Sequence, residues 1–274
     1  MKTDATWGPL AIRLTQTNVE VTEQPFTIAQ FQNVLNDDLY DDLCATFPTA
    51  DERWNLSKGG DSKAYISSVG QNAENFHDVV PTTSAWKVFI EAVSSQDFWS
   101  DVGALIHPMM LRHKKAGLLS PMLPELFVDA IDERDRFLDL LRRIGGPSLQ
   151  FSYLRPNDLN SPHSDRWEKL VSIIAYFPTP GWKEEFGGGT VFLRAKKDLA
   201  SLPWFRPTMN RVPASCRKEF AADMELFKRA DYRRNFWVLF CKTINSFHAV
   251  EPVKCPAPLA RRAFTMTLFW NPGL

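Results

Sequence analysis

Residues 147–177 read PSLQFSYLRPNDLNSPHSDRWEKLVSIIAYF and decide the fold. Their two ends are rich in β-branched and aromatic residues, and a segment of Pro, Asn and Asp separates them, which is typical of two strands joined by a loop. Three further runs of the same kind follow: TVFLR (190–194), NFWVLFC (235–241) and RRAFTMTLFW (261–270). Because little helical pattern lies between most of these runs, they indicate an antiparallel sandwich or jelly roll.

The chain before this stretch reads mostly as helix. Asn36 is a suitable N-cap for a helix that ends at Pro48, because two carboxylates follow it in the first turn, where they favour the helix dipole. Apolar spacing predicts two more helices, one over residues 84–93 and one from about residue 132 to the Gly-Gly-Pro sequence at 145–147.

These patterns predict an α+β fold with two regions in one integrated domain. Residues 1–146 form a helical or mixed support region, and residues 147–274 form the jelly-roll core. The core is interrupted by residues 194–234, where 215–229 carries a helical pattern. We interpret 194–234 as an insertion or lid.

The composition excludes several classes of protein. Lys plus Arg and Asp plus Glu both number 32, so the basic excess of a general nucleic-acid-binding surface is missing. No apolar stretch approaches the roughly 20 residues of a membrane-spanning helix, and residues 1–14 lack a secretory-signal pattern. The four cysteines form no CxxC pair, which argues against a zinc–thiolate site and indicates reduced thiols in a cytoplasmic protein.

The chemistry is carried by His163 and Asp165. Two positions apart at the edge of a strand, they are expected to project to the same face, so that a nitrogen and an oxygen reach one metal ion. His248, which follows the strand at 235–241, is the candidate third ligand. Two histidines and one carboxylate on one face of a metal leave the opposite positions open, as in non-haem Fe(II) oxygenases.

Four segments of the chain, in their order, resemble the Fe(II)/2-oxoglutarate-dependent dioxygenase superfamily: HSD, FGGGTVF, SFHAVEPV and RRAFTMTLFW. Their pattern is closest to the prolyl-4-hydroxylase-like branch of that superfamily. The resemblance covers roughly residues 147–272 and implies a double-stranded β-helix. It implies that His163, Asp165 and His248 bind catalytic Fe(II), with 2-oxoglutarate and O₂ as cosubstrates. The implied reaction oxidises an unactivated C–H bond and releases succinate and CO₂. The carboxylate at 165 favours hydroxylation, desaturation or cyclisation over halogenation.

The resemblance also assigns a basic residue to the distal carboxylate of 2-oxoglutarate, and Arg261 matches it. Arg261, Ala263 and Thr265 share one strand face, small and polar enough to line a cofactor cavity, and the guanidinium fork suits a carboxylate. Arg262 projects to the other face and is expected to be a surface charge. Ala263 departs from the serine of many members, which removes a hydroxyl.

Two tyrosines are further candidates for cosubstrate binding. Tyr176 lies on a strand face with Ser172 and Ile174, and Tyr153 precedes His163 by ten residues on the strand that leads to the metal. Both match positions at which related enzymes place a tyrosine. The alternative for each is a core aromatic ring with a satisfied hydroxyl.

Two other features have plainer interpretations. The three glycines at 187–189 are followed by a strand and by no Lys-Ser/Thr pair, which excludes a phosphate loop and indicates a tight entry to a strand near the cofactor. His77, His107 and His113 have no partner at ligand spacing and are expected to be structural or surface residues.

The substrate is much less determined than the cofactors. A small molecule, such as an amino acid or a natural-product intermediate, is favoured because no peptide-binding module is evident. The basic segment 194–234 would then present Arg206, Arg211 or Arg217 to an anionic group. A prolyl-type protein hydroxylase, a non-catalytic jelly-roll binding protein and, more remotely, a cupin-type sugar isomerase stay open, and the oligomeric state is unknown.

Overall fold

The computed structural model describes residue 12, residue 14 and residues 17–57, 61–70, 73–144, 146–158 and 160–270. Most of residues 1–14, to which the secretory-signal expectation refers, lie outside this part. The helices are α1 (Asp37–Ala45), α2 (Glu74–Val79), α3 (Ser84–Ser94), α4 (Gln96–Lys115), α5 (Glu125–Ala130), α6 (Arg134–Arg143) and α7 (Arg217–Asp223). The strands are β1 (Asn18–Thr22), β2 (Ile28–Gln32), β3 (Asn55–Leu56), β4 (Ala64–Ser67), β5 (Ser148–Leu154), β6 (Asn160–His163), β7 (Lys169–Tyr176), β8 (Thr190–Ala195), β9 (Met224–Ala230), β10 (Phe236–Cys241), β11 (His248–Val250) and β12 (Arg261–Phe269).

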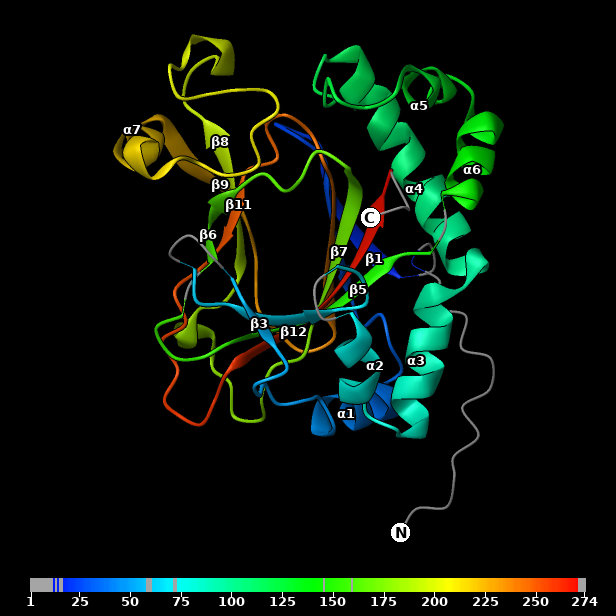
Figure 1. Cartoon of the computed structure of the whole chain (residues 1–274), viewed down its shortest axis with the longest axis vertical. Helices are drawn as coiled ribbons and strands as arrows, with labels where there is room; N and C mark the ends of the chain where they lie inside the picture. The colour runs from blue at the N-terminus through cyan, green and yellow to red at the C-terminus, as the bar shows by residue number, and fades with distance from the viewer. Residues whose placement is uncertain are drawn as a thin grey trace.

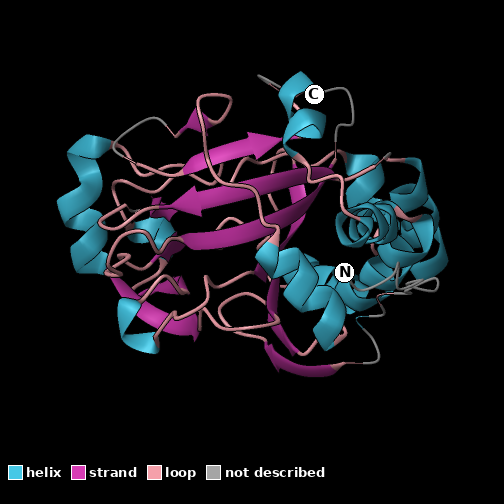
Figure 2. Ribbon diagram, turned by 90° about the horizontal axis from the view of Figure 1, so that it is seen from below, coloured by secondary structure: helices cyan, strands magenta, loops and turns pink. Residues whose placement is uncertain are grey.

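The strands form two antiparallel sheets, which confirms the predicted mixture of helices and antiparallel strands. The larger sheet has the order β1-β2-β10-β7-β12-β5-β4-β3, and the smaller has the order β6-β11-β8-β9. In Figure 1 the smaller sheet lies on the left, and α3 to α6 stand on the right. Most of the helices likewise lie to one side of the strands in the view from below (Figure 2).

The larger sheet buries both of its faces, because side chains alternate along each strand. On β12, Phe264 and Met266 pack with helix residues such as Trp86 in the main core. Ala263, which precedes Phe264 and points to the other face of the sheet, packs with Phe192 of the smaller sheet in a second core. The alternation predicted for this strand is therefore confirmed, and the space between the two sheets is where its polar face points.

The helices begin where their sequence signals place them. Asn36 caps α1, and its side chain accepts a hydrogen bond from the Asp38 backbone amide at 2.9 Å. Helices α3 and α6 also lie at the predicted places. Among the described residues no helix is both long and apolar enough to cross a bilayer. All four cysteines are free thiols.

The secondary structure differs from the sequence prediction in one segment. The first half of the chain contains α1 to α6 together with β1 to β4, which extend both edges of the larger sheet. The helical pattern over 215–229 holds only for α7, because Met224–Ala230 is β9 and pairs with β8. The hydrogen-bonding edge of β8, which is a tertiary partner, overrides the local pattern there. The domain boundary at 146/147 and a lid role for 194–234 stay predictions.

Candidate metal centre

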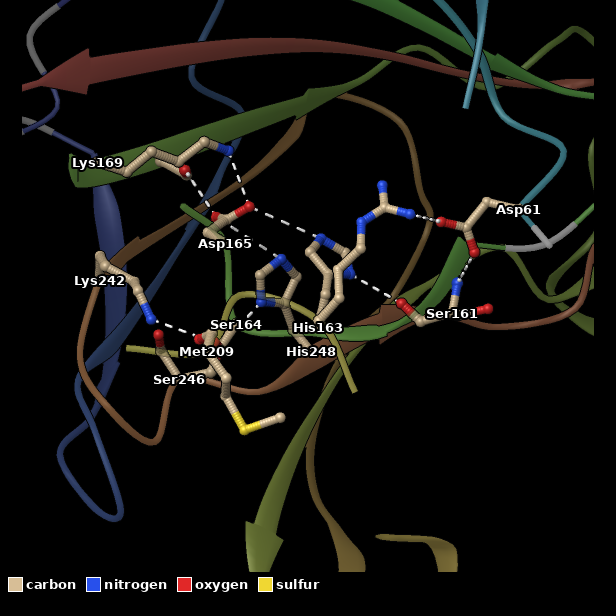
Figure 3. A network of polar contacts seen from close by, with 12 residues as sticks. Asp61, Ser161, His163, Ser164, Asp165, Lys169, Met209, Lys242, Ser246 and His248 are labelled. Atoms are coloured by element: carbon tan, nitrogen blue, oxygen red, sulfur yellow. Dashed lines mark hydrogen bonds and ion pairs between the residues drawn. The ribbon is translucent and has the colours of Figure 1, made fainter. Parts of the chain in front are cut away.

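His163, Asp165 and His248 meet at one end of the smaller sheet (Figure 3). His163 is the last residue of β6 and His248 the first of β11, and the two are direct partners in the antiparallel register. The Nε2 atoms of His163 and His248 lie 3.7 Å and 3.8 Å from the two Asp165 carboxylate oxygens. One atom from each residue lies within 4.8 Å of the others, a spacing at which a single cation can bind all three.

The backbone at Asp165 differs from the expectation that strand alternation aligns it with His163. The strand ends at His163, and Asp165 has a left-handed φ of 65°. Asp tolerates this conformation better than most residues, because its short polar side chain can form local hydrogen bonds. The turn of the chain, and not the pleat of a strand, therefore brings the carboxylate beside the imidazole.

Both histidine rings are oriented by backbone carbonyls. The Nδ1 atoms of His163 and His248 lie 2.8 Å and 3.0 Å from the carbonyl oxygens of Ser161 and Ser246. A carbonyl can only accept, so Nδ1 carries the proton and Nε2 presents a lone pair toward Asp165. Burial lowers the pKa of both rings, and for His163 burial together with His248 lowers the pKa to about 3. Both imidazoles are thus neutral donors at neutral pH.

The Asp165 carboxylate is held in its ionised form. Lys169 donates to Oδ1 at 2.8 Å and Ser172 to Oδ2 at 3.3 Å. Burial alone would raise the pKa of Asp165, but the charge and the hydrogen bond of Lys169 oppose it and hold the pKa well below its usual range. Two neutral nitrogens and one anionic oxygen form a donor set that fits Fe(II).

Three lysines around this centre were missed in the sequence. Lys169 lies four residues after Asp165, and that spacing is the only local signal for any of them. Lys242 is buried and donates to Ser164 Oγ at 3.2 Å, while Ser164 donates onward to the Met209 carbonyl at 2.8 Å (Figure 3). Burial and the charge of Lys169 lower the pKa of Lys63 to about 8.

Arg261 is a buried cation, with 2% of its surface exposed. Its Nε donates to the Gly188 carbonyl at 2.5 Å, and its guanidinium carbon lies 5.3 Å and 5.4 Å from the ring centres of Tyr176 and Tyr232. Among the described residues no carboxylate forms an ion pair with it. Since a buried charge is costly without a counter-ion, this guanidinium favours an anionic ligand.

Gly188 explains how the backbone comes so close to Arg261. An added Cβ would lie 3.3 Å from Arg261 Cδ and 3.2 Å from the Trp182 ring, and the residue has a φ of 79°. The glycine run does lead into a strand, β8, as predicted.

Arg262 corrects one expectation, because it is buried and not a surface charge. Its guanidinium donates to the carbonyl oxygens of Phe177, Cys44 and Pro178 at 3.0–3.2 Å. These partners lie on the helix-covered face of the larger sheet, opposite to the face of Arg261.

The remaining candidates for cosubstrate binding lie on both faces of the larger sheet. The Tyr176 hydroxyl donates to Thr190 Oγ1 at 2.6 Å, beside Arg261. Thr265 lies on the same face of β12 as Arg261. Tyr153 pairs with Arg262 and its ring packs on Trp54 at 6.3 Å, so it lies on the opposite face, apart from the other candidates.

The other histidines have structural or surface positions, as expected. His107 contacts the Ile131 carbonyl at 2.9 Å, and His113 accepts a hydrogen bond from the Thr27 backbone amide at 3.0 Å. His77 is exposed on α2. Within the described ranges, His163, Asp165 and His248 are the one group with metal-binding spacing.

Similarity to known proteins is found among solved structures, at low sequence identity. No family model and no curated protein matches the chain. Among solved structures, a Pseudomonas putida prolyl-4-hydroxylase is 12% identical, with a TM-score of 0.46, over 94% of this chain and 96% of that one. The α-ketoglutarate-dependent epimerase SnoN from nogalamycin biosynthesis is 11% identical, with a TM-score of 0.45, over 97% and 85% of the two chains.

A third match is a prolyl hydroxylase from Trichoplax adhaerens in complex with a peptide fragment of hypoxia inducible factor. It is 11% identical, with a TM-score of 0.39, over 88% of this chain and 83% of that one. The prolyl-4-hydroxylase and SnoN are enzymes of the kind that the sequence motifs resemble.

Proposed function

We propose that this chain is an Fe(II)- and 2-oxoglutarate-dependent dioxygenase that oxidises, by hydroxylation above all, a C–H bond of a small molecule. One observation carries the proposal: a two-histidine, one-carboxylate donor set lies in the same fold as a buried arginine that has no carboxylate partner among the described residues. The donor set fits Fe(II) with open positions, and the guanidinium of Arg261 fits the far carboxylate of 2-oxoglutarate.

The strand order supports a double-stranded β-helix. From β5 to β12, successive strands alternate between the larger and the smaller sheet, except that β8 and β9 are neighbours in the smaller one. The donor set comes from the smaller sheet and its adjoining turn, and Arg261 comes from the larger sheet. Ligands for a metal and for a cosubstrate on that metal would then be supplied from both walls of one barrel.

In this proposal each residue has a defined task. His163, Asp165 and His248 would hold the iron, which would supply the oxidation with O₂ and 2-oxoglutarate, and the latter would be converted to succinate and CO₂. Lys169 keeps the Asp165 carboxylate ionised and oriented. Arg261 holds the cosubstrate, with Tyr176 and Thr265 on the same sheet face. A cytoplasmic location and the absence of nucleic-acid or membrane partners stay predictions.

The decisive experiment is an anaerobic titration of the metal-free protein with Fe(II) and then 2-oxoglutarate. A visible metal-to-ligand charge-transfer band is expected for the wild type, with loss of iron binding in Asp165→Ala and weaker 2-oxoglutarate binding in Arg261→Gln. The exposed Arg194, which pairs with Glu225, supplies the control Arg194→Gln. Folded, iron-loaded wild type without the band would contradict the proposal and favour a binding protein or a cupin-type enzyme.

A second measurement separates the substrate classes. Succinate release is followed with a metabolite extract and with a protein extract as the only source of substrate, and the products are identified by mass spectrometry. Oxidation of a metabolite supports a small-molecule enzyme, whereas oxidation confined to protein side chains would make the chain a protein hydroxylase.

A further inference from the structure

Three polar side chains of the larger sheet point toward the smaller sheet and have no task in the proposed function. They are Lys63, which directly precedes β4, Tyr65 of β4 and Gln150 of β5. We infer that these three side chains bind the substrate, and that the substrate is a polar small molecule with an anionic group such as a carboxylate. The inference rests on the proposed function, because it places the substrate beside the proposed cosubstrate site.

The strand register places Tyr65 and Gln150 on the face that points toward the smaller sheet. Tyr65 pairs with Ser152, and Ser152 pairs with Ala263, which packs between the two sheets. Paired residues of antiparallel strands project to the same face, and so do residues two apart along one strand. Gln150, two residues before Ser152, therefore shares this face, and its own partner on β12 is Thr265. Gln150 thus adjoins a candidate for cosubstrate binding.

Lys63 extends this face by one position beyond β4. Its carbonyl accepts the Ser57 amide at 2.9 Å, so the pairing of the two edge strands reaches it. Continuing the register of β4 with β5, and of β5 with β12, aligns Lys63 with Leu154 and Arg261. The Lys63 amine lies 5.6 Å from the centre of the Tyr65 ring, as expected for two side chains on one face. Lys63 and Arg261 are therefore two cations in one row across the sheet.

The polar atoms of these three side chains are available to a ligand. Among the described residues, none of the three side chains has a hydrogen-bond partner or an ion pair, and all three are partly buried. Other polar side chains of the same face are satisfied within the protein, as Ser67 and Ser148 are by their contact at 3.2 Å. A small number of converging polar groups is what fixes the orientation of a small molecule in a binding site.

The charge of Lys63 determines the kind of ligand. Lys169 pairs with the Asp165 carboxylate at 2.8 Å, whereas Lys63 has no ion pair in the part of the chain that the structure describes. Asp61, two residues before Lys63, is occupied by Arg211 at 3.3 Å. Burial and the charge of Lys169 lower the pKa of Lys63 to about 8, and an anion at the amine would favour its charged form. A carboxylate is therefore the complementary group.

The segment that carries Lys63 is bonded to the strand of the candidate metal centre. Asp61 accepts the Ser161 amide at 2.7 Å, and Ser161 lies two residues before His163 in β6 (Figure 3). Two residues of extended chain span about 7 Å. One small molecule can therefore reach from the Lys63 amine to the metal centre.

The first test compares two probes with the same ring, 4-fluorobenzoate and the uncharged 4-fluorobenzamide. Each is titrated by fluorine NMR into the chain loaded with Zn(II) and saturating 2-oxoglutarate, which occupies Arg261. We expect wild type to prefer the benzoate, and Lys63→Gln to weaken benzoate binding about tenfold while benzamide binding stays unchanged. Lys63→Arg should keep the preference. Tyr65→Phe and Gln150→Ala remove hydrogen-bonding groups but no charge, and should weaken both probes about threefold.

Lys87→Gln is the matched control, because Lys87 is an exposed lysine of α3. This variant should bind both probes like wild type. No preference for the benzoate in wild type, or equal losses in Lys63→Gln and Lys87→Gln, would overturn the inference. A loss of 2-oxoglutarate affinity in Lys63→Gln, in place of benzoate affinity, would also overturn it, since Lys63 would then belong to the cosubstrate site.

The second test locates the probe relative to the metal and separates the inference from the proposed function. With Mn(II) in place of Zn(II), the fluorine relaxation of the benzoate is expected to accelerate in wild type and much less in Lys63→Gln. Binding of Mn(II) and 2-oxoglutarate without faster relaxation would overturn the inference and leave the proposed function standing.

The remaining outcome is that neither Mn(II) nor 2-oxoglutarate binds, which counts against the proposed function. The anion site is then tested by benzoate titration of Arg261→Gln with and without Lys63→Gln. A further loss of affinity on adding Lys63→Gln supports the anion site, and an unchanged affinity overturns it.

Discussion

Arg261 and Arg262 are neighbours in β12, yet their guanidinium groups lie on opposite faces of the eight-stranded sheet. Arg261 contacts the Gly188 carbonyl and the Tyr176 ring between the two sheets, whereas Arg262 donates to carbonyl oxygens on the helix-covered face. Alternation along a strand separates two chemically identical side chains into different environments. Their substitutions should therefore have different consequences.

Arg261→Gln is expected to lower 2-oxoglutarate affinity by about tenfold or more and to change stability little, because it removes a buried charge without a carboxylate partner among the described residues. Arg262→Gln is expected to lower the free energy of unfolding by about 2–4 kcal/mol, because buried carbonyls lose their donors. Urea unfolding and 2-oxoglutarate titration of both variants check this. If the two variants lost the same amount of 2-oxoglutarate affinity and of stability, the assignment of the two arginines to different environments would be contradicted.

Gly188 and Gly181 both have positive φ and differ in the space around them. At Gly188 an added Cβ meets Arg261 and Trp182, while at Gly181 nothing lies within 4 Å. Gly181→Ala should cost only the backbone strain, about 1–2 kcal/mol. Gly188→Ala should cost more and also weaken 2-oxoglutarate binding, because Arg261 must shift. Thermal unfolding and cosubstrate titration, compared between the two variants, decide this.

Metal binding should stabilise the folded chain, because the donor set is assembled only on folding. A redox-inert ion such as Ni(II), at about 100 times its Kd, is expected to add about 2.7 kcal/mol to the free energy of unfolding, and a chelator should remove the gain. Asp165→Ala should abolish the effect, whereas His77→Ala, at an exposed histidine, should retain it. Calorimetry with and without the ion measures this, and a gain that survives Asp165→Ala would place the metal elsewhere.

Acid should destabilise the protein partly through His113. Burial, with the charge of Arg112, lowers its pKa from 6.5 to about 4. The unfolded chain therefore binds a proton before the folded chain does, so this stability is present above about pH 6.5 and is lost as the pH falls toward about 4, by about 3 kcal/mol. His113→Gln should make the free energy of unfolding less dependent on pH in that window, as followed by urea unfolding. An unchanged slope would mean that other groups carry the effect, such as His163 and His248, whose pKa values are also lowered.

Local pattern predicted the elements whose signals are contained in the chain itself. The strands β5, β7, β8, β10 and β12 lie where β-branched and aromatic residues gather, and α1 begins at its own capping residue. The spacing of His163, Asp165 and His248 also singled out the residues that the fold then brings together. In each case the information is a short-range preference or a residue type that chemistry limits to few tasks.

Other features depended on partners far away in the sequence. β9 became a strand because β8 offers it hydrogen bonds, and Tyr153 faces the core because of its register with β12. The lysines around Asp165 and the burial of Arg262 under α1 follow from the packing of distant segments, which no periodicity records.

Propensity, capping and residue chemistry act over a few residues, so they are enough to predict the strand-rich core, the helix starts and the candidate donor set. Only the tertiary structure decided which face each of these side chains occupies, which charges are left without a counter-ion and which polar side chains face the space between the sheets. Those properties are set by burial and by hydrogen bonds between segments that lie far apart in the sequence, such as the bond between Arg262 and Cys44, which are 218 residues apart.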